Sequence, residues 1–220
     1  MFQKNTKLQI ISGIAGTCFV FLLWKFVNPF LAATLSPGGL RLLNIAAILS
    51  LALPPLLVMM LSGDKFSDCG FTSESLFLQI GTGIGIGLGM ATVLTLLPIL
   101  LGLERMVYTG AGFKTPEQAI VQLFYFVFIV GLSEEFIFRG FLYSKLDLIC
   151  FSDEMPVIIS STIFGLFHFS GFNFVQVLVC GLIGAFFCLC KKRIPHCTVV
   201  SLAIAHGIHD WMIRLLTTIL

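Results

Sequence analysis

The sequence predicts an all-α protein, a polytopic bundle of about seven transmembrane helices. Of its 220 residues 57% are hydrophobic and only 11% are charged, against about 25% charged residues in a typical soluble domain. The mean hydropathy is +1.02, and the apolar residues form long blocks, each close to the roughly 20 residues that a membrane-spanning helix needs. The net charge of +2 is too small to indicate a nucleic-acid partner. We therefore expect the lipid bilayer as the environment and no nucleic acid.

The apolar residues fall into seven blocks, separated by short stretches of charged and turn-forming residues. The first block follows lysines, as in a signal peptide, but no convincing cleavage site follows it, so we interpret it as a retained span. The fifth block is short for a span, and we expect it to be tilted or buried among the others. We expect one membrane domain over residues 1–220, with N-terminal spans in 1–115 and catalytic core spans in 116–220. The blocks run near 9–35, 41–62, 76–102, 118–148, 156–170, 173–190 and 197–219.

The lysines and arginines of the loops predict an orientation, because such residues are enriched on the cytoplasmic side of membrane proteins. They favour a cytoplasmic N-terminus and, for seven spans, a C-terminus outside. This orientation places Lys4, Lys7, Lys65, Lys145, Lys191, Lys192 and Arg193 in the cytoplasm and Arg41, Arg105 and Lys114 outside.

The third block contains five glycines at alternate positions, from Gly81 to Gly89. A phosphate-binding loop would lie between a strand and a helix, whereas these glycines are embedded in an apolar run. On a helix, Gly81, Gly85 and Gly89 form a GxxxGxxxG face that allows another helix to approach closely. We predict that this face packs against a neighbouring helix.

Several ionisable residues interrupt blocks four, five and seven. A charged side chain at the centre of a membrane costs about 2.5–3.5 kcal/mol even on the lenient insertion scale. Such residues usually face a bundle interior or a water-filled cavity and mark a functional site, although a structural polar network that fixes helix register is the alternative. The residues are Glu134, Glu135, Arg139, His168, His206, His209, Asp210 and Arg214.

Helix geometry separates the two glutamates. Glu135 and Arg139 are four residues apart and share a face, so we expect a largely structural salt bridge. Glu134 is rotated by about 100° from Glu135 and cannot use Arg139 in the same way. A buried carboxylate outside that pair suits a proton-accepting role near neutral pH.

The last block contains a second pair. His206 and Asp210 are four residues apart and share one face of the helix. Asp210 and Arg214 are also four apart, so an ion pair near the helix end is the alternative for Asp210. His209 is the weakest candidate, because it is rotated by about 60° from His206 and can point elsewhere. Together, a carboxylate, two histidines and a further polar group supply what peptide hydrolysis requires: a base that activates water and donors that stabilise an oxyanion.

Three motifs in this order, Glu134-Glu135-x-x-x-Arg139, Phe164-x-x-x-His168 and His206-x-x-x-Asp210, resemble the signatures of the CPBP family. This family comprises CAAX prenyl proteases and bacteriocin-processing enzymes and is also called the Abi family. The resemblance covers roughly residues 120–211, and a short Gly-containing turn at 68–71 also resembles the one that often precedes this family's third span.

The resemblance implies roles for these residues. Glu134 and His168 would activate the attacking water, His206 and Asp210 would occupy the positions of the oxyanion-stabilising pair, and Glu135 and Arg139 would shape the site. One departure is Asp210, where the CAAX proteases often have Asn, because an ionised carboxylate cannot donate a hydrogen bond to an oxyanion. Asp210 would serve if protonated, by orienting His206 or a water, or by pairing with Arg214.

The resemblance implies a glutamate-dependent enzyme, and we expect no cofactor. Zinc held by Glu134, His168, His206 and Asp210 is the alternative, although no H-E-x-x-H spacing indicates it. A second group with zinc-ligand residue types lacks the usual C-x₂₋₄-C spacing, and we interpret its cysteines as small apolar residues. That second group consists of Cys188, Cys190, His196 and Cys197.

We therefore expect an intramembrane endopeptidase that cuts near the C-terminus of a peptide or a small membrane-associated protein. The alternatives are a non-catalytic membrane factor for peptide binding or bacteriocin immunity, and a proton-coupled transporter, which the absence of an evident inverted repeat disfavours. The compact chain looks like a bacterial or archaeal relative with a substrate other than prenylated proteins. Its substrate and its oligomeric state are not predicted.

Overall fold

The computed structural model is all-α, as predicted, and it describes residues 5–103, 107, 112–169 and 173–219, among which there is no strand. Its chain forms two compact units, each made of two separate stretches of sequence. Unit 1 consists of Met1–Thr72 and Ser133–Ile194, and unit 2 consists of Ser73–Leu132 and Pro195–Leu220. Lys4 and Arg105, which contributed to the orientation argument, lie outside the described residues.

The described residues contain six helical segments that are long and apolar enough to cross a membrane. They correspond to six of the seven predicted blocks. The fifth block forms a shorter apolar helix, α9 (Met155–Phe167, 13 residues), about 20 Å long at 1.5 Å per residue and so shorter than the hydrocarbon core. The protein is an integral, multi-pass membrane protein. The long segments are Thr6–Ala32, Pro37–Ser62, Leu76–Leu100, Pro116–Asp147, Phe174–Arg193 and Val199–Ile219.

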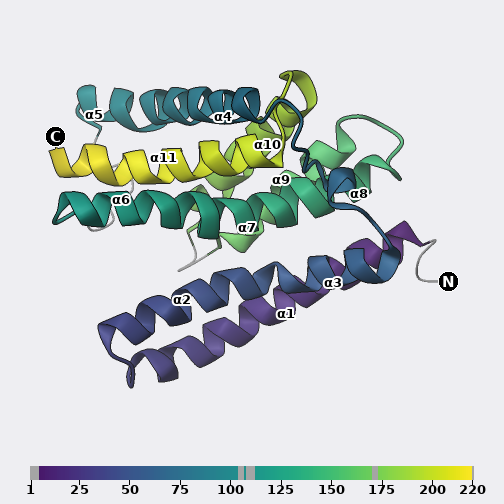
Figure 1. The fold of residues 1–220 in the computed structure, drawn as a ribbon, viewed down its shortest axis with the longest axis horizontal. Helices are drawn as coiled ribbons and strands as arrows, with labels where there is room; N and C mark the ends of the chain where they lie inside the picture. The colour runs from purple at the N-terminus through teal and green to yellow at the C-terminus, as the bar shows by residue number, and fades with distance from the viewer. Residues whose placement is uncertain (1–4, 104–106, 108–111, 170–172, 220) are drawn as a thin grey trace. The chain divides into compact units, whose positions relative to one another are not determined.

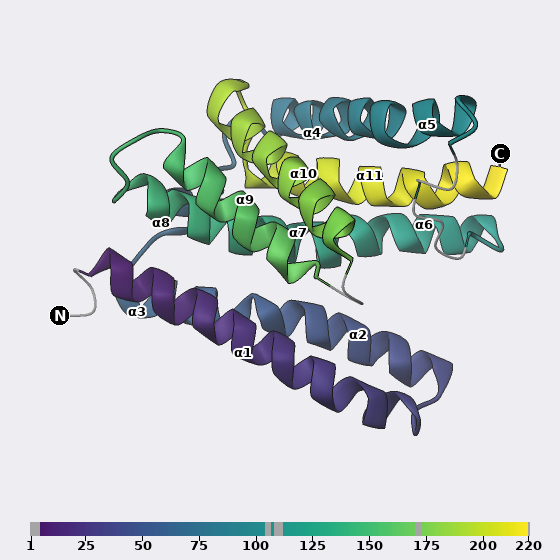
Figure 2. The same ribbon diagram turned by 180° about the vertical axis from the view of Figure 1, so that it is seen from behind.

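In unit 1 the first two spans form a helical hairpin (Figures 1 and 2). Asn5 caps the first helix by accepting a hydrogen bond from the Leu8 amide, and Ser36 caps the second in the same way, ahead of a proline in the first turn. Between the helices, the Thr17 hydroxyl donates to the Leu51 carbonyl at 3.1 Å. The helices are α1 (Thr6–Ala32), α2 (Pro37–Leu51) and α3 (Leu53–Ser62).

A short 3₁₀ turn, η2 (Phe66–Cys69), follows this hairpin and confirms that residues 68–71 form a turn. Asp68 accepts a hydrogen bond from the Lys65 amide at 2.9 Å, and Gly70 ends the turn at φ +83°, in the left-handed region that favours glycine. Burial raises the pKa of the Cys69 thiol to about 11. Cys69 is therefore protonated at neutral pH and a poor nucleophile.

The second part of unit 1 contains the first two motifs. Within the fourth span, the short helix α7 (Leu132–Glu135) begins at the boundary of the units. It continues through a π-helical turn into α8. The next two helices, α9 and α10, pack against each other (Figure 2). Phe141 and Leu142 of the π-helical turn are fully buried in the apolar core of this unit. The remaining elements are η6 (Phe136–Leu142), α8 (Tyr143–Asp147) and α10 (Phe174–Arg193).

In unit 2 the last helix lies between two others (Figures 1 and 2). Helix α11 (Val199–Ile219) packs against the third span on one side and the first half of the fourth span on the other. The third span consists of α4 (Leu76–Ala91), η3 (Thr92–Leu96) and α5 (Leu97–Leu100), and the half-span consists of α6 (Pro116–Phe124) and η5 (Tyr125–Gly131).

The glycine face that packs is not the predicted one. A Cβ atom added at Gly83 would lie 2.5 Å from the Ser201 carbonyl oxygen, and one at Gly87 would lie 2.8 Å from that of Ala205. A Cβ atom at Gly81, Gly85 or Gly89 would meet nothing within 4 Å among the described residues. The prediction of close packing was right in kind but placed on the wrong face, because five alternating glycines offer two GxxxG registers and periodicity does not choose between them.

Gly83→Ala is expected to destabilise the protein by about 1–3 kcal/mol, because the new methyl group meets rigid backbone. Gly85→Ala is the matched control, two residues away on the open face, and should be neutral or mildly stabilising because alanine favours helix. Thermal unfolding in detergent measures the difference between the two. Equal behaviour of the two variants would contradict the assignment of the packing face.

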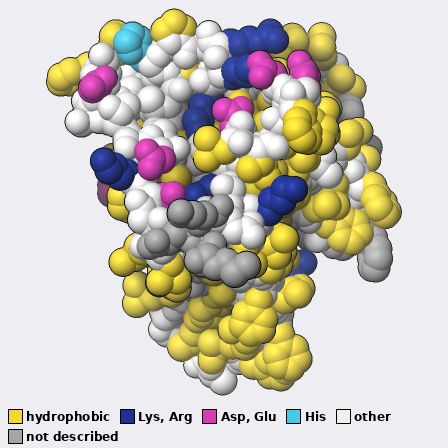
Figure 3. Space-filling model, turned by 90° about the vertical axis from the view of Figure 1, so that its right-hand side faces the viewer, with side chains coloured by type: hydrophobic (Ala, Val, Ile, Leu, Met, Phe, Trp, Pro, Cys, Tyr) yellow, Lys and Arg dark blue, Asp and Glu magenta, His cyan; other side chains and the backbone are white. Residues whose placement is uncertain are grey.

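Charged side chains join the ends of several helices at one end of unit 1. Lys145 Nζ lies 2.5 Å from Asp64 Oδ2 and 2.6 Å from Gln9 Oε1. Lys192 Nζ lies 2.7 Å from Asp153 Oδ2, which lowers the pKa of that exposed carboxyl. Basic and acidic side chains are interspersed at this end (Figure 3). The placement of Lys145 and Lys192 on the cytoplasmic side of the membrane stays a prediction.

Candidate active site

Glu134 and His168 lie together in unit 1. Glu134 projects from α7, and His168 is the residue at which α9 ends. Glu134 Oε2 is 3.7 Å from His168 Nε2, and the two side chains are 22% and 27% exposed. The structure thus brings together the two residues to which the resemblance assigns water activation.

The other ring nitrogen of His168 fixes its orientation. His168 Nδ1 lies 2.9 Å from the carbonyl oxygen of Phe164. Because a carbonyl oxygen can only accept, Nδ1 carries the proton in this hydrogen bond. In the neutral imidazole Nε2 is then a lone-pair acceptor, and it is the atom that faces Glu134.

Aromatic rings support this histidine. The Phe164 ring centroid lies 4.6 Å from that of His168, and the Phe138 ring lies 5.0 Å from Phe164 and 5.3 Å from Phe167, both edge-on. Phe138 and Phe164 are each 2% exposed. Phe164 therefore contributes both a packing surface and the carbonyl acceptor, which gives a physical reason for its place in the second motif.

Glu135 and Arg139 form the predicted salt bridge. Arg139 Nη1 lies 3.0 Å from Glu135 Oε1, and both side chains are fully buried. The guanidinium also stacks over the rings of Phe164, at 4.2 Å, and Phe187, at 5.4 Å. Among the described residues, Arg139 Nε and Nη2 have no hydrogen-bond partner. This pair connects the helix of the first motif to the aromatic support of His168.

His206 and Asp210 lie together in unit 2, one turn apart on α11. His206 Nε2 is 3.5 Å from Asp210 Oδ2, as their spacing predicted, and His209 Nδ1 is 3.6 Å from Asp210 Oδ1. The carboxylate of Asp210 therefore lies between two imidazoles. Each histidine is less than 10% exposed.

The alternative ion pair between Asp210 and Arg214 is not formed among the described residues. The Arg214 guanidinium lies instead over the Phe126 ring, 4.9 Å from its centroid. Asp210 already has two imidazole neighbours on its own helix, and the aromatic face offers the cation a compatible contact.

Sequence reasoning undervalued His209. A rotation of about 60° from His206 suggested a different direction, but Asp210 is adjacent to His209 in sequence and reaches it with its second oxygen. The sequence does contain a signal for this contact: Asp210 follows His209 by one position and His206 by four, so one carboxylate can reach both imidazoles. His209 Nε2 is buried and has no hydrogen-bond partner among the described residues.

The described residues contain no group of three or more His, Cys, Asp or Glu side chains placed to hold a metal ion. Each unit provides one pair of candidate ligands from the motifs: Glu134 with His168, and His206 with Asp210. The meeting of the two pairs in one centre stays a prediction. All seven cysteines are free thiols, and Cys69, Cys188, Cys190 and Cys197 are buried.

The geometry of unit 1 suits proton transfer from water. A carboxylate oxygen and an imidazole nitrogen lie 3.7 Å apart. Glu134 Oε2 is itself buried, but both side chains are partly exposed, and each can accept a hydrogen bond from a water there. The pair in unit 2 places a carboxylate beside two imidazoles, whose ring N–H groups can donate hydrogen bonds.

Comparisons with known proteins agree with the motifs. Residues 116–212 match the family model described as type II CAAX prenyl endopeptidase Rce1-like, and the match includes all three motifs. No curated protein and no solved structure matches the chain. The matched segment begins with α6 and ends in α11, so it includes Glu134, His168, His206 and Asp210. The match covers slightly less than half of the chain and supports its resemblance to the CPBP family of CAAX proteases.

Proposed function

We propose that this protein is an intramembrane endopeptidase in which Glu134 and His168 activate the water that hydrolyses a peptide bond. The observation that carries the proposal is the 3.7 Å approach of Glu134 Oε2 to His168 Nε2, inside the segment that matches the endopeptidase family. Both groups belong to apolar helical segments, where an ionisable residue is costly unless it serves a purpose.

In the proposed reaction one water donates hydrogen bonds to Glu134 and to His168. Its oxygen attacks the carbonyl carbon of the peptide bond, and its proton moves to the Glu134 carboxylate. The resulting tetrahedral intermediate carries an oxyanion. When the C–N bond breaks, Glu134 returns the proton to the leaving amine, which balances the reaction without a covalent enzyme intermediate.

We assign His206 and Asp210 to the oxyanion. Asp210 as a carboxylate would repel the oxyanion directly, but its two imidazole contacts support a different role. It orients the His206 imidazole, so that a ring N–H donates to the developing charge. His209 shares the same carboxylate and acts as a positioning residue. The proposal includes that the Glu134–His168 pair and the His206–Asp210 pair act on the same substrate.

The substrate class that fits is a peptide or a small membrane protein reached from within the bilayer. We further propose a bacterial or archaeal cell membrane, with the N-terminus in the cytoplasm. The positive-inside rule supports this side for the lysines of unit 1.

Comparative proteomics of membranes from cells with wild-type protein or Glu134→Ala tests the function. We expect at least one precursor to accumulate with Glu134→Ala while the variant protein is present at the wild-type level. Glu117→Ala, which removes an exposed carboxylate from the same span, is the control and should process normally. Full processing by Glu134→Ala would rule out the proposal and favour a non-catalytic peptide-binding or immunity factor.

Removal of metal ions is expected to leave the activity unchanged. The proposed proton transfers use only Glu134 and histidines, so treatment with a zinc chelator should not slow cleavage. Elemental analysis of the purified protein should find zinc well below one equivalent. One equivalent of zinc that is lost together with activity, and regained with it, would replace the glutamate mechanism by a zinc mechanism.

A further inference from the structure

The π-helical turn after the first motif changes the main-chain hydrogen bonding of the fourth span. In an α-helix the Tyr143 amide would donate to the carbonyl four residues back, that of Arg139. Here it donates to Phe138, five residues back. π-Helical turns within α-helices are frequently found at functional sites, and this turn, Phe136–Leu142, begins two residues after Glu134.

Side chains from the next two helices bind the carbonyls at this junction. Lys191 Nζ of α10 lies 2.6 Å from the Arg139 carbonyl oxygen and 3.0 Å from Ser144 Oγ. Ser160 Oγ of α9 donates to the Phe138 carbonyl at 2.8 Å, in a fully buried position. The π-helical turn deprives the Arg139 carbonyl of the Tyr143 amide, and Lys191 supplies the donor that this buried carbonyl needs. The Phe138 carbonyl accepts both the Tyr143 amide and the Ser160 hydroxyl, so Ser160 fixes the π-helical turn to α9.

The Ser160 bond connects the helix of His168 to the helical span of Glu134. Ser160 lies on the helix that ends at His168, and the carbonyl it binds lies four residues after Glu134. A shift of one residue in the hydrogen-bond register of the fourth span rotates the preceding side chains by about 100°. Such a rotation would separate Glu134 from His168.

We infer that Ser160 and Lys191 are positioning residues for the catalytic pair: they hold the π-helical turn that sets Glu134 against His168. They take no part in the proposed proton transfers, and the inference rests on the proposed function. Lys191 and Ser160 lie outside the three motifs, so the assignment comes from their contacts with the main chain.

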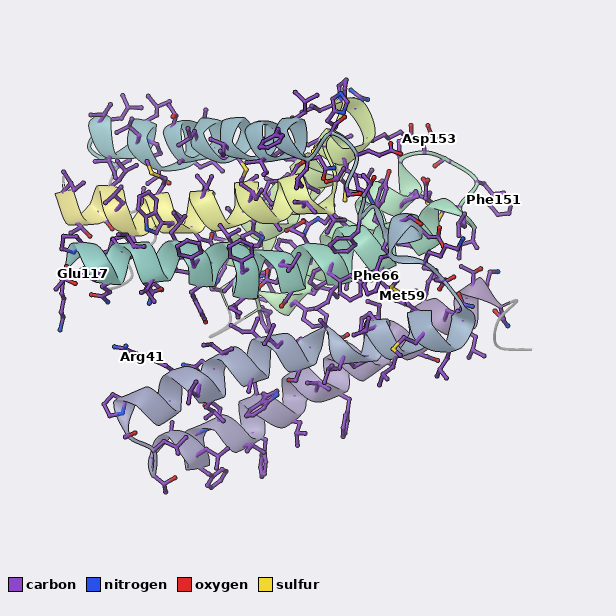
Figure 4. All side chains as sticks on the ribbon, viewed as in Figure 1. Arg41, Met59, Phe66, Glu117, Phe151 and Asp153 are labelled. Atoms are coloured by element: carbon purple, nitrogen blue, oxygen red, sulfur yellow. The ribbon has the colours of Figure 1, made fainter. Side chains whose placement is uncertain are left out.

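Two adjacent residues provide matched controls. Lys192 is the next residue of α10, but its ammonium binds the exposed Asp153. Asp153 lies in the loop before α9 (Figure 4). Ser161 is the next residue of α9 and is also buried, but its hydroxyl lies 4.0 Å from the Cys188 sulfur and binds no carbonyl among the described residues. Lys192→Met and Ser161→Ala are therefore the same substitutions as Lys191→Met and Ser160→Ala, but they leave the hydrogen bonds to the π-helical turn intact.

The first measurement is steady-state cleavage of the precursor that accumulates with Glu134→Ala. Lys191→Met and Ser160→Ala are each expected to lower kcat by about 10- to 100-fold, because a misplacement of about 1 Å can cost that much. KM should stay within about twofold of the wild-type value, since substrate contacts are unchanged. Lys191→Arg retains a cationic donor and should restore most of kcat, and the two control variants should match the wild type.

The second measurement does not need a substrate. In protein labelled with ¹⁵N-histidine, the ring resonances of His168 report its contact with Glu134, and His168→Gln assigns them. Lys191→Met and Ser160→Ala should each move these resonances toward those of Glu134→Gln, while Lys192→Met and Ser161→Ala leave them at the wild-type position.

The two measurements, of kcat and of the His168 resonances, distinguish a failure of the inference from a failure of the proposed function. If Glu134→Ala abolishes processing but Lys191→Met and Ser160→Ala retain wild-type kcat and His168 resonances, the inference is wrong and the proposed function stands. If no precursor accumulates with Glu134→Ala, the proposed function fails and the catalytic inference falls with it, whatever the resonances show. Should Lys191→Met fail to accumulate in the membrane, Ser160→Ala and Lys191→Arg still decide the question.

Discussion

Glu134→Gln is expected to lower kcat for the natural precursor by about 10²- to 10⁴-fold, the usual contribution of a general base. Glutamine keeps the size of the side chain and its ability to bind water, but it cannot accept the proton of the attacking water. The substitution removes charge from an apolar span, so the folded protein should be at least as stable as the wild type. Single-turnover cleavage by purified protein in lipid vesicles measures the loss.

Glu117→Gln is the matched control for this change. Glu117 lies in the first turn of α6 in the same span, is exposed and lies far along the chain from the motif (Figure 4). Its replacement should leave kcat within about twofold of the wild-type value. A Glu134→Gln variant that cleaves as fast as Glu117→Gln would remove Glu134 from the mechanism.

Arg139→Met should give the largest loss of stability of any single substitution considered. Arg139 and Glu135 are fully buried and 3.0 Å apart, and removing one partner of a buried pair leaves an uncompensated charge that costs about 3–5 kcal/mol. The change also removes the cation from the faces of Phe164 and Phe187. Thermal unfolding in detergent, or the amount of protein retained in the membrane, measures the effect.

Two further variants test the reason for that loss. Arg41→Met removes an exposed arginine of α2 in the same unit and should change the stability by less than about 0.5 kcal/mol (Figure 4). The double variant Glu135→Gln/Arg139→Met removes both charges and should recover part of the stability that Arg139→Met loses. If the double variant loses more stability than the two single variants lose together, a buried ion pair is not the cause of the loss in Arg139→Met.

Local periodicity predicted the contacts within single helices. The pairs Glu135–Arg139 and His206–Asp210 followed from a separation of four residues and are present as expected. The apolar blocks likewise matched helix positions to within a few residues, and the short fifth block became a short helix. These features depend on the α-helical repeat alone, which a sequence displays directly.

Contacts between helices were not predicted in the same way. The sequence could not distinguish the Gly83–Gly87 face from the Gly81–Gly85–Gly89 face, because the choice depends on which helix lies alongside. The approach of Glu134 to His168 was expected from the family resemblance, since no spacing connects residues on different helices. The family match over residues 116–212 supports the resemblance but does not assign residue roles.

The π-helical turns were also not predicted from periodicity. Three of them, at Thr92–Leu96, Tyr125–Gly131 and Phe136–Leu142, lie within apolar spans. A π-helical turn is stabilised by side chains elsewhere that bind its carbonyls: Lys191 binds the displaced carbonyl of Arg139, and Ser160 binds that of Phe138. Those partners are 22 and 52 residues away along the chain from the carbonyls that they bind, so no local pattern reveals them.

A double-mutant cycle on kcat/KM tests most directly whether Glu134 and His168 act on one water. The variants are Glu134→Gln, His168→Gln and the combination of both, measured on the same precursor. If the two residues work as a unit, the double variant should lose about as much activity as the more impaired single variant. Losses that multiply, so that each substitution has its full effect in the presence of the other, would show that the two residues contribute independently and would contradict the account.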